Sequence, residues 1–213
     1  VLAVASGRVL RMRDGMADVS VRQVGREALD GKDCGNGLVI DHGNGWETQY
    51  CHLHRGSIVV RPGEEVSPGQ TLAQVGLSGL AEFPHVHVTV RHDGEVVDPF
   101  DYRPDVKAME SGSACSTSVR GASLWAEELR GALSYKEGTV LNSGFTDRPI
   151  KMDDIEAGAL HSPGKDAPAI VAYARAIGLR QNDVQDLEIV GPDGEMLIEH
   201  SADPLDNDKA QVF

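Results

Sequence analysis

The segment NGLVIDHGNGWETQYC, residues 36–51, has the pattern of a β-hairpin. An apolar run rich in β-branched residues is followed by Gly43-Asn44-Gly45 and then by a return strand that begins at Trp46. Glycine and asparagine tolerate the backbone conformations of tight turns, so they favour a chain reversal at this point. We predict an antiparallel pair in which Asp41 faces Trp46.

The same register bears on the cysteines, which are Cys34, Cys51 and Cys115. None belongs to a C-x-x-C pair, so a structural zinc knuckle is not indicated. If Asp41 faces Trp46, Cys34 lies diagonally from Cys51 on one sheet face, within reach of a disulfide where the edge is bulged or twisted. The alternative is two buried free thiols. A disulfide would indicate an oxidising compartment.

Further along the chain, Pro84-His85-Val86-His87-Val88 places two imidazoles two residues apart in a strand-like run. Side chains alternate between the faces of a strand, so His85 and His87 should point to the same side. Two such imidazoles can divide a task, one binding a metal while the other handles protons. A polar strand face with incidental histidines is the alternative for the bare motif.

Residues 1–103 are predicted to form a mainly β domain of short antiparallel strands joined by glycine-rich turns. The chain contains 24 glycines and only 5% aromatic residues, and apolar runs alternate with turn signals. The remaining strands are expected at residues 1–4, 8–11, 17–21, 57–60, 65–66, 71–75, 86–91 and 95–97.

The second half of the chain is predicted to be a separate domain, residues 119–213, after a linker at residues 104–118 rich in Ser, Gly, Glu and Ala. A short helix is expected within residues 124–133. Strands are expected at residues 138–142, 150–152, 170–177, 187–190 and 195–198, and residues 170–177 could instead be helical. We predict a small β-sandwich of the immunoglobulin-like kind.

Composition limits the possible functions. With 40% hydrophobic residues in a 213-residue chain, a substantial core can form. The formal net charge of −13 makes nucleic acid an improbable partner. No apolar run approaches the roughly 18 residues of a membrane-spanning helix, and no transmembrane segment is expected. The opening Val1-Leu2-Ala3-Val4 has no secretory signal and is expected to be part of a longer protein.

Taken in order, the motifs of residues 1–101 resemble those of the lysostaphin-type zinc metallopeptidases, cell-wall endopeptidases that cleave peptidoglycan. That family shows V-I-D-H-G-x-G-x-x-T-x-Y-x-H-L, then V-x-x-G-x-x-V-x-x-G-x-x-[IL]-x-x-V-G, an H-x-H strand and a V-D-P ending. The matching residues here are Val39-Ile40-Asp41-His42-Gly43, Thr48, Tyr50, His52-Leu53, Gly63, Val66, Gly69, Leu72, Val75-Gly76, His85, His87 and Val97-Asp98-Pro99.

The resemblance implies a role for each histidine of the motif. His87 would be a zinc ligand, and His52 and His85 would be the catalytic imidazoles. Amide hydrolysis needs a proton acceptor for the attacking water and a donor for the tetrahedral oxyanion, and two histidines beside a metal can serve both needs. Tyr50 is a candidate for lining the substrate groove, although a packed core tyrosine is an equal alternative.

The sequence departs from the family pattern in its zinc ligands. The resemblance implies two further ligands in an H-x(3)-D arrangement, upstream of the segment that matches residues 1–9. A catalytic zinc usually has about three protein ligands. We therefore expect an incomplete zinc site in this chain, with weak zinc binding and little hydrolysis.

The resemblance predicts a zinc-dependent peptidoglycan endopeptidase in the periplasm or outside the cell, with peptidoglycan and possible cell-wall or divisome proteins as partners. The first alternative is a non-catalytic relative that regulates cell-wall amidases or binds peptidoglycan. The second is a carrier-like or phosphotransfer hybrid barrel, because the spaced Val and Gly residues also occur in biotinyl and lipoyl domains. No lysine suited to modification lies in a central hairpin turn, which disfavours this second alternative.

Overall fold

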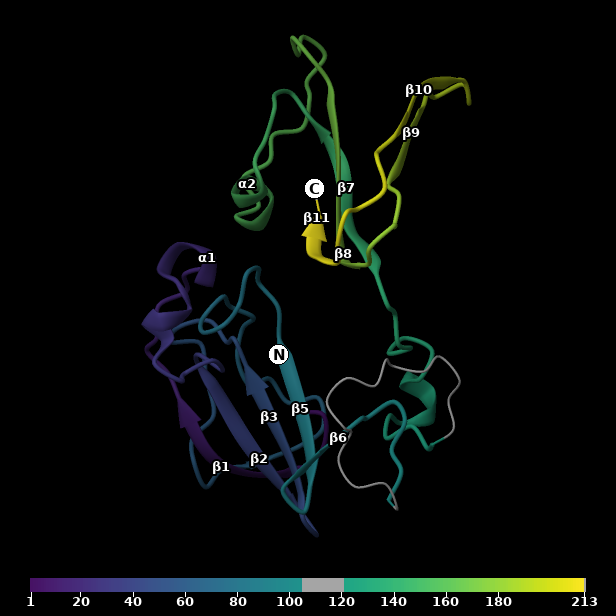
Figure 1. Ribbon diagram of the computed structural model, residues 1–213. Helices are drawn as coiled ribbons and strands as arrows, with labels where there is room; N and C mark the ends of the chain where they lie inside the picture. The colour runs from purple at the N-terminus through teal and green to yellow at the C-terminus, as the bar shows by residue number, and fades with distance from the viewer. Residues whose placement is uncertain (105–120, 213) are drawn as a thin grey trace. The chain divides into compact units, whose positions relative to one another are not determined.

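The computed structural model describes residues 1–104 and 121–212 and divides the chain into two compact units, Val1–Ser134 and Tyr135–Phe213 (Figure 1). The predicted linker, residues 104–118, lies outside the described residues except for residue 104. Residues that follow it belong to the first unit, because Tyr102 and Ala122 exchange backbone hydrogen bonds of 3.0 and 3.1 Å.

The first unit is built on a six-stranded antiparallel sheet with the strand order β4-β1-β2-β3-β5-β6 (Figure 1). The helical pieces of the unit are short: α1 (Val21–Val24), η1 (Arg26–Leu29) and η2 (Glu127–Leu129). The mainly β, antiparallel fold predicted from the sequence is confirmed. The strands are β1 (Gly7–Arg13), β2 (Gly37–Gly43), β3 (Trp46–Cys51), β4 (Glu65–Val66), β5 (His87–His92) and β6 (Glu95–Val97).

The predicted hairpin is present as β2 and β3, but its register differs from the prediction by one residue. Asp41 faces Glu47, Trp46 faces Gly43, and an irregularity lies between Asp41 and Gly43. A bulge adds one residue to one strand, so a register counted symmetrically from the turn is displaced beyond it. The prediction that Asp41 faces Trp46 was therefore wrong.

The core lies on one face of this sheet. Leu38 and Ile40 of β2 and Tyr50 of β3 are almost fully buried there, together with Leu53 and Leu72 from the segments that cover the sheet. Leu38 faces Tyr50 across the strand pair, which brings two large side chains onto the same face. The inward side chains of β3 thus alternate with outward ones, and the outward ones can build a site.

Four predicted strands of this unit are not formed: residues 1–4, 17–21, 57–60 and 71–75. Residues 1–4 and 57–60 make backbone hydrogen bonds outside any strand, such as those from the Ala3 amide to the Gln70 carbonyl and from the Val59 amide to the Leu72 carbonyl, both 2.9 Å. Residues 17–21 form no strand, because Ser20 instead caps α1 by accepting a hydrogen bond from the Arg22 amide at 3.3 Å. Residues 71–75 run beside other segments but make only isolated bridges, Leu2 to Thr71 and Leu53 to Val75. The expected helix within residues 124–133 is reduced to the single turn η2.

The second unit contains a three-stranded antiparallel sheet, β11-β8-β7, and a separate two-stranded sheet, β10-β9. Residues 150–152 do not form the expected strand, because α2 begins at Met152, with the Asp154 carboxylate accepting the Lys151 amide at 2.8 Å. The immunoglobulin-like sandwich remains a prediction. Elements are β7 (Thr139–Thr146), α2 (Met152–Glu156), β8 (Val171–Leu179), β9 (Asp186–Val190), β10 (Met196–Ser201) and β11 (Lys209–Val212).

In the described parts of the chain, no helix has both the length and the apolar character needed to cross a membrane.

Candidate functional site

The paired strands β3 and β5 carry the first part of the site at their ends. Tyr50 faces Val88, and Cys51 faces His87 in the antiparallel register. Tyr50 belongs to the core and Val88 packs against it. Because neighbouring residues of a strand point to opposite faces, Cys51 and His87 lie on the sheet face away from the core. His87 is exposed there.

His52 follows β3 directly and adopts an uncommon backbone conformation. Its φ is +61°, in the left-handed region that residues other than glycine rarely occupy. Its amide donates to the Cys34 carbonyl at 2.9 Å, and its carbonyl accepts from the Gly76 amide at 2.8 Å. These two bonds hold the chain in a conformation that turns the side chain out of the strand direction. The residue is only 6% exposed.

His85 lies two residues before His87, on the segment that leads into β5. It forms an antiparallel bridge with Gly76, the residue whose amide also binds the His52 carbonyl. The backbone of Gly76 thus lies between His52 and His85 and brings them together. His85 precedes the start of β5, so the predicted H-x-H strand contains only its second histidine.

His52, His85 and His87, called the histidine cluster below, place three imidazoles close together. The His52 ring centroid lies 4.8 Å from that of His85 and 5.9 Å from that of His87. The interplanar angles are 50° and 86°. The rings are therefore near enough to act on one small group without being stacked on each other.

Backbone carbonyls fix the proton positions of two of these rings. His52 Nδ1 lies 2.8 Å from the Ser78 carbonyl oxygen, and His85 Nδ1 lies 2.8 Å from that of Phe83. A carbonyl oxygen only accepts hydrogen bonds, so Nδ1 carries the proton in both rings. In the neutral form this leaves the lone pair on Nε2, the nitrogen that can take up a proton or bind a metal.

Removal from water lowers the pKa of two rings of the cluster, His52 and His87. For His52, the charges of His85 and His87 act on the pKa in the same direction. The pKa of His87 is also lowered, mainly by partial removal from water and to a smaller extent by the charge of His85. A second proton on His52 or His87 is therefore disfavoured, and a neutral imidazole is the form suited to accepting a proton.

The cluster does not by itself provide the donor set of a zinc site. Imidazole nitrogen is a good zinc ligand, but a catalytic zinc takes about three protein donors and keeps a fourth position open for water. Among residues 1–104 and 121–212, no group of three or more His, Cys, Asp and Glu side chains is arranged to hold a metal ion. The described residues therefore do not fit a complete catalytic zinc site.

The structure also settles the cysteine pair and the position of Tyr50. Cys34 and Cys51 form a disulfide with a Cα–Cα distance of 4.7 Å, which confirms the predicted pairing. Tyr50 is fully buried, and its hydroxyl accepts from the Val4 amide at 2.9 Å and from the Thr48 hydroxyl at 3.3 Å. Its side chain has no exposed surface with which to line a groove, so its position fits the alternative of a packed core tyrosine.

Two buried polar residues near the cluster were not assigned a role from the sequence. Ser78 and Asn36 are both 0% exposed, and the Asn36 amide donates to the Ser78 hydroxyl at 2.9 Å. They are 42 residues apart in the chain, so no local pattern links them. Only the folded arrangement shows that Ser78 holds His52.

Comparison with known proteins places this sheet and its histidine cluster in a family of peptidases. Residues 1–99 match the model of Peptidase family M23. Lipoprotein NlpD of Yersinia enterocolitica is 33% identical over 70 residues, which are 33% of this chain and 69% of the relative. The chain belongs to peptidase family M23, which confirms the lysostaphin-type resemblance.

Other relatives are longer proteins that match over a part of their length. Peptidoglycan DD-endopeptidase ShyB of Vibrio cholerae is 34% identical over 87 residues, 40% of this chain and 20% of the relative. The crystal structure of a zinc containing peptidase from Vibrio cholerae shares 30% identity over 44% of this chain and 24% of that chain, with a TM-score of 0.34. The match covers 20% of the length of ShyB and 12% of the length of ShyA, another peptidoglycan DD-endopeptidase of Vibrio cholerae.

Proposed function

We propose that residues 1–103 form a zinc-dependent endopeptidase domain that cleaves peptidoglycan. The observation that carries this proposal is the histidine cluster, in which His52 after β3 and the pair His85 and His87 at the start of β5 come together at one end of an M23 sheet. The substrate class is supported by relatives whose names describe peptidoglycan DD-endopeptidases.

In this proposal His52 and His85 are the catalytic imidazoles. Hydrolysis of an amide requires a group that takes a proton from water and a group that donates to the developing oxyanion or the leaving amine. Both rings hold Nδ1–H on a carbonyl and therefore present Nε2 for these tasks. The lowered pKa of His52 favours the neutral ring, which suits the proton acceptor.

His87 is proposed as a zinc ligand, with the other ligands supplied from outside the described residues. Bound zinc contributes Lewis acidity to hydrolysis. Because the described residues lack a three-donor set, we expect the 213-residue chain alone to bind zinc weakly and to hydrolyse little. Elemental analysis after desalting checks this expectation, and one equivalent of retained zinc would contradict it.

The proposed location is the cell envelope, in the periplasm or outside the cell. The disulfide between Cys34 and Cys51 supports an oxidising compartment, because cytosolic thiols are normally kept reduced. Peptidoglycan would be the principal partner, and cell-wall or divisome proteins are proposed as further partners.

Digestion of purified peptidoglycan tests the function. The protein produced from its full gene, loaded with zinc, should release muropeptides whose masses identify a cleaved peptide bond. His85→Ala should lower the release by about 10²–10⁴-fold while the protein still binds the sacculi. If the unaltered protein binds sacculi or an amidase partner but releases no muropeptide at any zinc concentration, the non-catalytic alternative replaces the proposal.

A further inference from the structure

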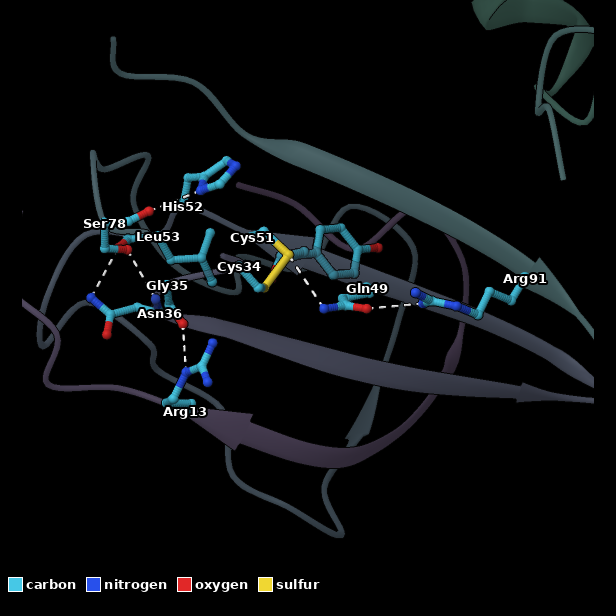
Figure 2. Close-up of a disulfide and its surroundings, with 11 residues drawn as sticks. Arg13, Cys34, Gly35, Asn36, Gln49, Cys51, His52, Leu53, Ser78 and Arg91 are labelled. Atoms are coloured by element: carbon cyan, nitrogen blue, oxygen red, sulfur yellow. Dashed lines mark hydrogen bonds between the residues drawn. A yellow bond between two sulfur atoms is a disulfide. The ribbon is translucent and has the colours of Figure 1, made fainter. Parts of the chain in front are cut away.

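The disulfide joins the two chain segments that meet at His52. Cys51 is the residue immediately before His52, and the Cys34 carbonyl accepts the His52 amide at 2.9 Å. One covalent link therefore fixes both the strand that leads into His52 and the loop that binds its backbone (Figure 2). Cys34 Sγ lies close to the backbone of Gly37. Glycine is required at this position because a Cβ would lie 2.7 Å from the sulfur.

Ser78 holds the side chain of the same histidine. Its carbonyl accepts from His52 Nδ1, and its hydroxyl donates to the Leu53 carbonyl at 2.8 Å while accepting from the Asn36 amide at 2.9 Å (Figure 2). The Asn36 side chain also donates to the Leu53 carbonyl at 3.1 Å. The segments after Cys34 and after His52 are thus both tied to Ser78 in a buried position.

The loop that contains Cys34 also contacts the Ser78 segment through its backbone. The Leu80 amide donates to the Asp33 carbonyl at 2.7 Å. A Cβ at Gly35 would collide with the Ser78 backbone, so the two segments pack with no side chain between them. A displacement of Cys34 would consequently move both the acceptor of the His52 amide and the acceptor of the His52 ring.

We propose that the Cys34–Cys51 disulfide and Ser78 position His52. The backbone and ring of His52 keep their geometry in the site only while the two cysteines are joined. This inference rests on the proposed function for its catalytic meaning, although its structural content can be tested without hydrolysis. Reduction by dithiothreitol breaks the S–S bond and forms two thiols. The reagent supplies two electrons and two protons and becomes a cyclic disulfide.

Histidine NMR of the 213-residue chain tests the structural part. In a Cys115→Ser background, which leaves only the two paired cysteines, ring nitrogen shifts report the tautomer and amide exchange reports the His52 and Leu53 backbone. On reduction we expect His52 to lose its fixed Nδ1–H tautomer and its amide protection, with the core signals unchanged. Retention of both features overturns the proposal, and so does unfolding of the whole unit, because the disulfide would then be a general staple.

The variant Ser78→Ala tests the positioning of His52 without breaking the Cys34–Cys51 disulfide. With the disulfide intact, loss of the hydroxyl should release the carbonyl that holds the His52 ring and produce the same change in its nitrogen shifts. Thr48→Val is the matched control, since it removes an equally buried hydroxyl from β3 that bonds His42 and Tyr50. Unchanged His52 shifts in Ser78→Ala, or equal shifts in both variants, would overturn the role of Ser78.

Activity of the zinc-loaded, full-gene protein gives an independent second readout. Reduction and Ser78→Ala should each lower the rate of muropeptide release, by up to about 100-fold if His52 is misplaced by about 1 Å. If the protein has no activity, the proposed function fails while the NMR result still decides the positioning role. If activity is high and unaffected by complete reduction, the positioning role alone fails.

Discussion

The strand pair β3 and β5 carries a histidine environment at each end, and the two ends differ in what their rings can do. At one end His92 stacks on Trp46, with ring centroids 4.2 Å apart and an interplanar angle of 18°, and its Nδ1 lies 3.0 Å from the Tyr102 hydroxyl. At the other end His52 and His85 bind only backbone carbonyls through Nδ1 and are not stacked on each other.

This difference separates a histidine used for packing from histidines prepared for chemistry. The face of His92 is covered by an indole, which contributes to stability and restricts its access. In the histidine cluster, by contrast, carbonyls fix the tautomers of His52 and His85 and leave Nε2 as the reactive nitrogen, and Gly76 and Ser78 bind His52 through their backbones. Histidines lie at both ends of the same two strands, so residue type alone does not show which of them serve packing and which serve chemistry.

The largest expected effect is on catalysis in the zinc-loaded, full-gene protein. His52→Ala and His85→Ala should each lower muropeptide release by about 10²–10⁴-fold, the range for loss of a general acid or base. His92→Ala should retain most of the activity, because its ring lies at the far end of the strands. Equal losses in all three variants would remove the proposed distinction between the ends.

The next largest effect is on stability through the disulfide. Cys34→Ser combined with Cys51→Ser should lower the free energy of unfolding by about 3 kcal/mol, the chain-entropy value for a loop of this size. The sequence separation of the two cysteines is 17 residues. Urea denaturation followed by circular dichroism measures this loss, with Cys115→Ser as the single-site control. A midpoint unchanged from that control would show that the link adds no stability.

A smaller effect concerns stability, for which the end of the strand pair that carries His92 should be the more sensitive one. His92→Ala should lower the free energy of unfolding by about 1 kcal/mol, because it removes a stacked aromatic contact. His87→Ala, at an exposed site, should change it by less than about 0.5 kcal/mol. The same urea series compares them, and a larger loss for His87→Ala than for His92→Ala would contradict the assignment of His92 to packing.

The smallest effect concerns pH in the zinc-free chain. The pKa values of His52 and His87 are lowered in the folded state, so below about pH 6.5 these two side chains bind more protons in the unfolded chain than in the folded chain. Their contribution to stability is complete above the unfolded pKa and decreases as the pH falls through the folded values. Urea midpoints in EDTA between pH 7.5 and 5.5 should fall, less steeply in His52→Gln. An identical slope in that variant would assign the effect to other groups.

Much of the first unit could be predicted because its signals are local. The Gly43-Asn44-Gly45 turn predicts the hairpin, and the disulfide requires only that the two cysteines lie near each other on that hairpin. Residues 17–21 and 150–152 were misassigned because short apolar runs fit strand and helix alike, and caps from Ser20 and Asp154 decided for helix.

The sequence by itself determined the family, the β-hairpin, the cysteine pair and the identity of the three histidines, because these follow from spacing and residue type. Only the tertiary structure decided how the three rings lie relative to one another and which nitrogen carries the proton in His52 and His85. The Ser78 carbonyl binds a ring 26 residues away in the chain, and the Gly76 amide binds the His52 carbonyl. Such contacts depend on the packing of distant segments, and no local pattern encodes them.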